Sequence, residues 1–582
     1  MRNRQQGIAL ITALIITVVV GIVVFGTFFT TQIELWVTRN DRASTQAYYV
    51  AQTGLHKYKA ALFQAYRYIE GDSESGNPDS TVCFNQLSLG IDWQRDGSLS
   101  DWQSNRLGPY VHEVFDVSGQ AIGEYSVTLL RDPSNSSVFT VESAGESAGA
   151  RATLRSSFLV RNSDVLDYAI YARAGGGQRL FNGNVRIHGG LYIEGDATDP
   201  ADYENVIDTN GNFTQYNDYD LTDNSRVRDH LTQANRTASN LCAALRVQHG
   251  KVKLDGSSQL GTNDNNILGL FVGRGEEDIE VHTSECQRNR GICAERVGPF
   301  DLEEAPKFPE LDNEPEPRNE KCLEGESWRD CVNRDAGTTG LVIERDSAGN
   351  ITLSPSGVVA NSEACEVGLQ DALSGNLLVL DDSPFDCTSS DGTRGIKYQD
   401  GQLQVFGTVT LRGFDVTAQR HTDYLANTTE GTSTKRNATL FVESYYENSE
   451  DEQGIGGNMT TMRDLRPDRD HMDGGQFPDH VLGLIVEKKF DQNRAGTNAT
   501  NVMAPIYAGE VFRTQVQNVT IGSVLTDLFC STSAGGGECG SGTAAGQAAQ
   551  FYHVDLGNNR PALMQSHGAT KPVFEHLSTE RR

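Results

Sequence analysis

An uninterrupted apolar run opens the chain, with no charged residue from Ile8 to Phe29. As an α-helix rising about 1.5 Å per residue, this run would be roughly 33 Å long, enough to cross a bilayer core of about 30 Å. Arg2 and Arg4 precede it, which favours a cytoplasmic N-terminus. A cleaved secretory signal is the alternative, but its apolar region usually spans about 7–15 residues before a small-residue cleavage site. The sequence TFFTTQIELW that follows here offers no such site.

The helical pattern continues beyond the apolar run. Small and apolar residues recur at three- and four-residue spacing, which is one stripe of a helix. They are Ala47, Tyr48, Ala51, Leu55, Tyr58, Leu62, Ala65, Tyr66 and Ile69. We therefore predict one long helix over residues 8–70, with 8–29 in a membrane and the second half packed on a globular head.

Short alternating segments follow a polar loop: YVHEVFDV, GEYSVTLLRD, SVFTVESAG and ARATLRSSFLV. Each is bounded by turn residues, which predicts an antiparallel meander. Together with the helix it forms an α+β head, whose sheet portion we place at residues 71–163.

From residue 164 onward the pattern changes to many short alternating segments separated by long polar excursions. In one of them Val185, Ile187, Leu191 and Ile193 alternate around two glycines. In another, GQLQVFGTVTLRGFDV, we expect the four residues Leu403, Val405, Val409 and Leu411 on one face. Segments this short bury a core only when stacked, so we predict a large all-β domain over 164–582, built as a β-solenoid. No fixed period is present, and a large β-sandwich is the alternative.

The composition agrees with a β-rich chain with many turns, and the net charge limits which ligands its surface can bind. The 582 residues carry a formal net charge of −29 and include 59 glycines. Such acidity argues against a protein whose main surface follows phosphate backbones, because that binding depends on Lys and Arg. A local basic patch stays compatible with it.

The ten cysteines contain no CxxC pair, so disulfides in an oxidising compartment are favoured over a zinc site. Four pairs are close in sequence, and Cys83 and Cys242 are left over. The four candidate pairs are Cys286 with Cys293, Cys322 with Cys331, Cys365 with Cys387, and Cys530 with Cys539.

Three segments together resemble the type IV pilin and pseudopilin superfamily, in particular PilX-like minor pilins. They are the basic leader MRNRQQG, the apolar run IALITALIITVVV and the stretch AYYVAQTGL. The resemblance implies that residues 1–7 are a leader, that a prepilin peptidase cuts between Gly7 and Ile8, and that the new amine of Ile8 is methylated. The apolar helix then leaves the inner membrane for the core of a filament.

One position departs from the family pattern. Major pilins of the family carry Glu as the fifth residue after the cut, and that carboxylate is expected to pair with the amine of a neighbouring subunit. Thr12 occupies this position here. A subunit with Thr12 lacks the carboxylate but still offers its own amine, so we expect it first in the filament, at or near the tip.

The large extension resembles that of the oversized minor pilins of competence and pilus systems. This implies a single-pass inner-membrane protein that later lies on the cell surface, with other pilins as partners and DNA or a surface as ligand of the β domain. A type II secretion pseudopilin and an adhesin anchored by an uncleaved helix are the alternatives.

No enzyme is expected. GESAG matches the G-x-S-x-G pattern around Ser147, but a strand pattern follows it instead of the helix that a nucleophile elbow requires.

Two clusters are candidates for metal binding. Asp208, Asn210 and Asn212 have the spacing of a calcium loop, but Phe213 replaces the expected glycine, so an Asn-rich turn is favoured over calcium. A second cluster, Asp470, His471, Asp473, Asp479 and His480, is read as a solvated acidic loop, with metal binding as the alternative. No cofactor is otherwise expected.

Overall fold

The computed structural model describes residues 2–69, 106–161, 165–564 and 573–581, apart from internal gaps of which 533–548 is the longest. In several stretches, among them 2–10, 60–69, 158–161 and 573–581, only the backbone is described. The described chain forms two compact units. The first holds the helix to residue 66, the segment up to 160 and the residues from 573 onward, and the second holds 161–564.

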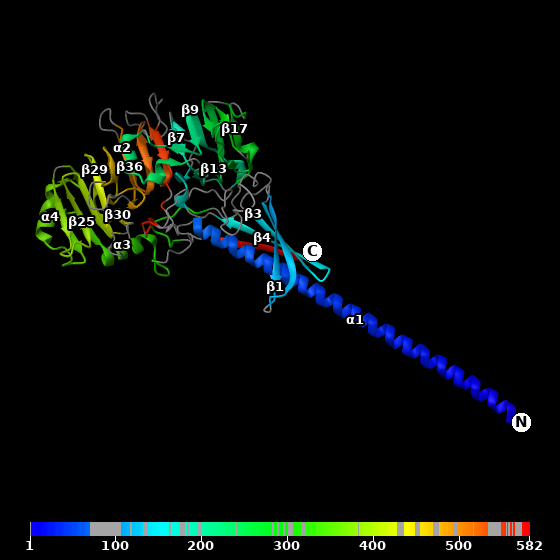
Figure 1. The fold of residues 1–582 in the computed structure, drawn as a ribbon. Coiled ribbons are helices and arrows are strands. Elements are labelled where there is room, and N and C mark those ends of the chain that lie inside the picture. Colours follow the sequence, from blue (N-terminus) through cyan, green and yellow to red (C-terminus); the bar gives the residue numbers. More distant parts are fainter. Residues whose placement is uncertain are drawn as a thin grey trace. The chain divides into compact units, whose positions relative to one another are not determined.

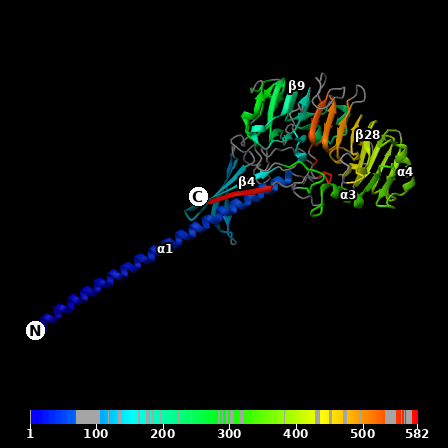
Figure 2. The same ribbon diagram turned by 180° about the vertical axis from the view of Figure 1, so that it is seen from behind.

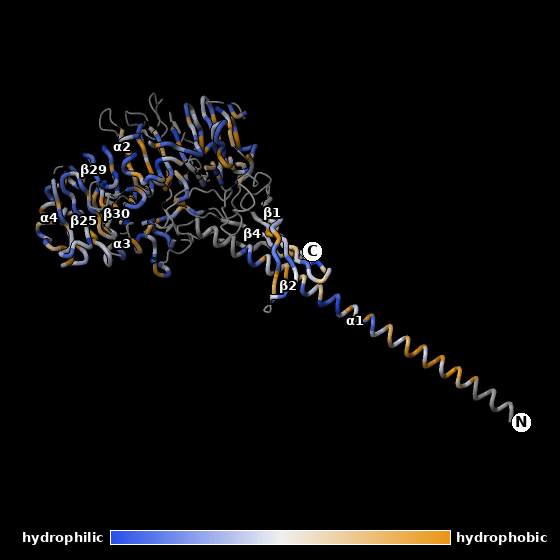
Figure 3. Tube along the Cα trace, viewed as in Figure 1, coloured by the Kyte–Doolittle hydropathy of each residue, from blue (hydrophilic) through white to orange (hydrophobic). Residues whose placement is uncertain are grey.

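One helix, α1 (Arg2–Ile69), begins the first unit (Figure 1). From Ile11 to Phe29 the exposed side chains are largely apolar, the mostly orange stretch of the helix in Figure 3. The helix continues without interruption through Gly21, Gly26 and Gly54. Of these three glycines, only Gly54 lies where another element approaches.

A five-stranded sheet completes the first unit, in the order β1-β2-β3-β4-β41. The strands are β1 (Arg106–Phe115), β2 (Ala121–Arg131), β3 (Val138–Ser147), β4 (Ala150–Arg161) and β41 (Val573–Arg581). The first four form the predicted antiparallel meander. The last strand was predicted to belong to the large domain, yet it lies beside β4. The second unit is therefore an insertion between two strands of the head sheet.

The second unit contains a 22-stranded and a 12-stranded sheet in which most neighbours are parallel. Three parallel ladders run through them. The first ladder is, in order, β20 (Leu341–Arg345), β27 (Thr408–Arg412), β30 (Arg436–Tyr445), β34 (His480–Val486), β37 (Ile506–Gln515), β39 (Val524–Thr532), β5 (Ile170–Ala174), β8 (Leu191–Ile193), β13 (Ala244–Val247), β16 (Gly269–Val272) and β19 (Val297–Gly298).

The second ladder is β23 (Leu377–Leu380), β28 (Asp415–Ala418), β32 (Met459–Thr461), β35 (Lys489–Gln492), the ends of β37 and β39, β6 (Phe181–Asn182), β9 (Asn205–Gly211), β14 (Lys251–Gly256) and β17 (Ile279–Val281). The third ladder is β26 (Gln402–Phe406), β29 (Thr422–Asn427), β33 (Leu465–Pro467), β36 (Asn501–Met503), β38 (Val519–Ile521), β40 (Ala549–Tyr552), β7 (Val185–His188), β10 (Phe213–Tyr216), β15 (Gln259–Leu260) and β18 (Gly291–Ile292).

Shorter elements cover or extend these ladders. Antiparallel additions are β21 (Ile351–Ser354), β22 (Leu373–Ser374), β24 (Phe385–Thr388), β25 (Gly395–Gln399) and β31 (Ile455–Gly456), and β11 (Tyr219–Asp220) pairs with β12 (Thr237–Ala238). The helices are α2 (Ser225–Arg228), α3 (Trp328–Thr339) and α4 (Ser362–Asp371), with 3-10 turns at Val165–Asp167, Pro200–Asp202, Gln233–Arg236 and Glu276–Asp278.

The chain enters the ladders in their middle. From β5 it proceeds through β8, β13 and β16 to β19 at one end. It resumes at β20, at the other end, and returns through β27 to β39, which pairs with β5. Figure 2 shows β9 and α4 towards opposite ends of this unit. In the first ladder, β5, where the chain enters the unit, therefore pairs with β39, which comes near the end of the unit in sequence.

The core lies between the ladders, and alternate residues point into it. The side chains of Val185, Ile187, Leu191 and Ile193 are all buried, as the alternation predicts. Burial of such a side chain contributes about 1.5–3 kcal/mol relative to exposure.

One detail of the core differs from the prediction of a shared strand face. Leu403 and Val405 belong to β26, in the third ladder, whereas Val409 and Leu411 belong to β27, in the first. All four are buried. Gly407 turns the chain between the two strands with φ 72°, and a Cβ there would lie 2.3 Å from the Thr339 oxygen. Only glycine fits this corner.

The segment leading to β20 covers the outside of the first ladder. Trp328 of α3 is 2% exposed, and its indole nitrogen donates to the Leu563 backbone oxygen at 2.9 Å. Next to it, Arg329 donates to Glu443 at 3.1 Å and to Glu487 at 3.0 Å, both nearly buried carboxylates. The indole hydrogen bond and the buried ion pairs thus hold α3 in place.

Candidate functional site

The first half of α1 is an apolar surface without a partner among the described residues. The large apolar side chains between Ile11 and Val37 are 52–71% exposed. An 18-residue window of this helix has mean hydropathy 2.6, none of it buried, and the helix is long enough to cross a membrane. An exposed apolar surface of this extent marks a membrane or protein contact.

The hydroxyl groups on this half of the helix bond to the helix itself. Thr17 donates to the Ala13 oxygen at 2.8 Å, and Thr30 donates to the Gly26 oxygen at 2.9 Å. Such bonds satisfy a hydroxyl where water is absent. Thr12, the residue predicted to affect assembly, lies on this exposed surface. The predicted processing residues Gly7 and Ile8 lie in the helical backbone, and their side chains are outside the described part.

The second half of α1 packs closely on the head sheet. Four residues of the predicted stripe and the neighbouring Val50 are at most 7% exposed, whereas Tyr48 of that stripe is partly exposed. The four are Ala47, Ala51, Leu55 and Tyr58. Gly145 of β3 makes the close approach possible, because a Cβ there would lie 2.4 Å from both the Ala47 oxygen and the Ala51 nitrogen. A Cβ on Gly54 would lie 2.5 Å from the Ser143 hydroxyl oxygen.

Aromatic residues hold the helix to the first two strands. The Tyr58 hydroxyl lies 2.9 Å from Nε2 of His112, and the Tyr58 ring stacks on Tyr110 with centroids 6.0 Å apart. His112 in turn contacts Tyr125 at 5.4 Å between ring centroids. The helix is therefore anchored at one half only, and its other half is available to lipid or to other helices.

Ser147 ends β3, at the turn to β4. It is 4% exposed, and its hydroxyl donates to the Ile122 backbone oxygen at 2.6 Å. This contact stabilises the sheet and explains the serine without catalysis.

The metal candidates are not arranged as a loop around an ion. Asp208 and Asn210 belong to β9 and pair with Lys253 and Asp255 of β14. The Asn212 backbone oxygen accepts a hydrogen bond from the nitrogen of Val185.

In the second predicted cluster, Asp470, His471 and Asp473 lie outside the described residues. His480 begins β34 and is 2% exposed, directly after Asp479.

Three of the four predicted cysteine pairs are bonded in the structure: Cys286 with Cys293, Cys322 with Cys331, and Cys365 with Cys387. Cys530 is also disulfide-bonded. Cys83, Cys242 and Cys539 lie outside the described residues. The Glu326 carboxylate lies near the Cys322–Cys331 disulfide, but it pairs with Arg334 at 2.8 Å. The disulfide and this ion pair therefore stabilise the start of α3.

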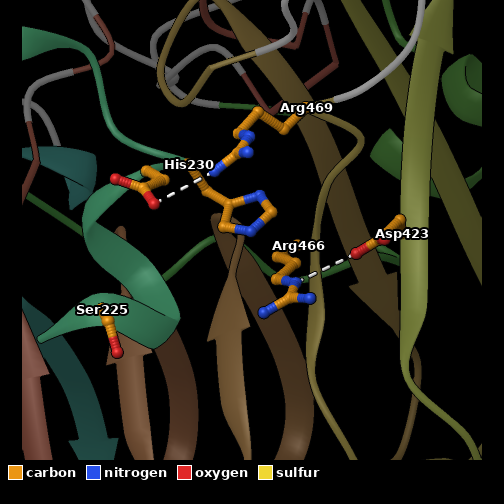
Figure 4. Close-up of a pocket in the computed structure, with 6 residues that line it drawn as sticks. Ser225, His230, Asp423, Arg466 and Arg469 are labelled. Carbon is orange, nitrogen blue, oxygen red and sulfur yellow. Dashed lines mark hydrogen bonds and ion pairs between the residues drawn. The ribbon is translucent and has the colours of Figure 1, made fainter.

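A polar cavity of about 290 Å³ was not predicted from the sequence (Figure 4). Its lining comes from three distant segments, and no motif joins them. The lining residues are Ser225, Asp229, His230, Asp423, Arg466 and Arg469.

Residues 6–56 match the PilX N-terminal family. The structure resembles the crystal structure of the competence-associated pilin ComZ from Thermus thermophilus, with a TM-score of 0.72 and 37% sequence identity. The likeness covers 93% of this chain and 98% of that one. No curated protein sequence matches the chain.

Proposed function

Because the chain belongs to the PilX-like minor pilins of type IV pili, we propose that α1 enters the filament at or near its tip and that the inserted β unit is displayed for DNA uptake. The observation that carries this proposal is the likeness to a competence-associated pilin over 93% of the chain, an extent that must include most of the inserted unit. The role is structural and needs no catalytic residue.

Assembly follows from the two halves of α1. After a cut between Gly7 and Ile8 and methylation of the new amine, the apolar half exchanges inner-membrane lipid for neighbouring pilin helices. Apolar area stays buried in both places, so the exchange itself has little driving force and an assembly motor must supply the work. The half anchored on the sheet keeps the head fixed to the moving helix.

The tip position rests on Thr12. A carboxylate in an apolar filament core is stable only beside an opposite charge, and Thr12 carries no charge that could meet the amine of a neighbouring subunit. A Thr12→Glu variant should therefore enter the shaft, whereas the native chain stays at filament ends. Immunogold labelling of sheared filaments tests this, and equal shaft labelling for both proteins would contradict the tip position.

The three parallel ladders support a β-solenoid as the architecture of the inserted unit. Each coil would contribute one strand to each ladder, and apolar residues at alternate positions would fill the interior. Such a rigid scaffold presents long loops on its surface, where binding residues are common.

DNA uptake is tested by deleting the gene and restoring it with the native chain. We expect pili to persist while uptake of labelled DNA falls, because a minor subunit is not the shaft. Unchanged uptake in the deletion strain would favour adhesion, and loss of the pili themselves would favour assembly priming. Loss of exported enzymes with normal pili would instead favour a type II secretion pseudopilin.

A further inference from the structure

The cavity in Figure 4 is formed between the third ladder and a segment that covers it, which we call the cover segment (219–241). Apolar residues of this segment, such as Leu231, pack against Met503 and Ile521 on the outer side of the ladder. The cover segment contributes Ser225, Asp229 and His230, and the ladder side contributes the other lining residues. Because both walls are packed, the cavity exists before any ligand arrives.

Opposite charges balance in the lining. Arg466 donates to Asp423 at 3.0 Å, and Arg469 donates to Asp229 at 3.0 Å. Two cations thus face two anions. An oxyanion bound here would lie against both carboxylates, in a chain whose net charge is already −29. The charge distribution therefore opposes a phosphate or carboxylate ligand.

The lining also has donors and acceptors in fixed places. Nδ1 of His230 lies 2.8 Å from the Pro467 backbone oxygen, so this nitrogen must carry the proton. The side chain is 8% exposed, and burial together with the charge of Arg466 lowers its pKa, so the ring is neutral near pH 7. Its Nε2 is then an acceptor, for which the described residues provide no donor.

Two further groups have unused capacity among the described residues. Oδ2 of Asp423 has no donor, because Arg466 bonds only to Oδ1. Nη2 of Arg466 has no acceptor, since its other nitrogens bond to Asp423, Asp464 and the Arg226 backbone oxygen. Acceptors and a donor therefore face the same small space.

We propose that this cavity binds one uncharged, hydroxyl-rich sugar residue. A hydroxyl group donates and accepts at the same atom, so adjacent hydroxyls satisfy Asp423 and Arg466 together, and another donates to Nε2 of His230. A volume near 300 Å³ is at the small end for ligand sites, which suits a single ring. The site belongs to the inserted unit alone, so it stands whether or not the chain lies at a filament tip.

The test uses the full-length protein in a detergent without a sugar head group. Glucose, galactose, mannose and N-acetylglucosamine are titrated separately by calorimetry, alongside inorganic phosphate and a short DNA duplex. We expect at least one sugar to bind and phosphate not to compete with it. A glycan ending in that sugar should bind at least as tightly, which distinguishes a terminal residue from the free sugar.

Two variants separate the possible ligands. Asp423→Asn replaces an acceptor oxygen with a donor and removes a negative charge; sugar binding should weaken about tenfold, whereas an oxyanion would bind more tightly. Arg466→Gln removes the Nη2 donor and should weaken sugar binding, and the control Arg290→Gln, an exposed residue elsewhere on the unit, should leave it unchanged. Equal unfolding temperatures show that the variants remain folded.

Three results would overturn the proposal. They are failure of all four sugars to bind, whether or not phosphate or DNA binds, tighter sugar binding by Asp423→Asn, and sugar binding that Arg466→Gln leaves intact.

Discussion

The packing of α1 on the head sheet leaves no room for a side chain at position 145, and Gly145→Ala tests this directly. The added Cβ would lie 2.4 Å from the Ala47 oxygen and the Ala51 nitrogen, where ordinary contact requires 3.4 Å or more. Both neighbours are backbone atoms, so the helix must move away by about 1 Å, and closely packed interiors resist such a shift. We expect a loss of about 1–3 kcal/mol, localised to the helix–sheet interface.

Hydrogen exchange followed by mass spectrometry measures this locally. Peptides covering 47–58 and β3 should exchange faster in Gly145→Ala, and peptides of the second unit should not change. Gly26→Ala is the matched control, because nothing lies within 4 Å of a Cβ there and alanine favours the helix. Unchanged protection at 47–58 in Gly145→Ala would refute the close packing of helix and sheet.

Two further predictions concern the second unit. Arg329→Met leaves the buried Glu487 carboxylate without its cation and should lower the free energy of unfolding by about 3–5 kcal/mol in thermal or denaturant melts. Arg151→Met removes an exposed ion pair and should cost less than about 1 kcal/mol. Equal losses in the two variants would contradict a stabilising role for the buried pair. Burial lowers the pKa of His188 to about 4 from 6.5, so the native state binds fewer protons than the unfolded chain between these values. The stability that the neutral His188 ring contributes is present above about pH 6.5, and roughly 3 kcal/mol of it should be lost as the pH falls towards 4. His188→Gln should make the free energy of unfolding less dependent on pH in this range. Parallel profiles of unfolding free energy against pH for the two proteins would contradict this.

The hydrophobic pattern along the sequence was sufficient to predict the elements whose burial is local. The stripe around Ala47 and Leu55 predicts the packed half of α1, because a helix on a sheet buries one face. The alternation at Val185 and Ile187 predicts inward-facing strand residues for the same reason. Cysteines close in sequence, such as Cys286 and Cys293, are close in space because the chain between them is short.

The path of the chain through the ladders could not be predicted in this way. Ile170 of β5 pairs with Val524 of β39, and nothing in either strand's alternation specifies so distant a partner. The return of β41 to the head sheet is hidden for the same reason. The cavity was missed because Asp229 and Asp423 come from separate excursions whose polar residues look like solvated loops until the fold joins them.

The central claim is that the apolar half of α1 is a processed assembly element. Mass spectrometry of the chain recovered from purified filaments tests it most directly. We expect mature protein that begins at a methylated Ile8. Molecules that still begin at Met1, together with filaments that lack the chain, would contradict it.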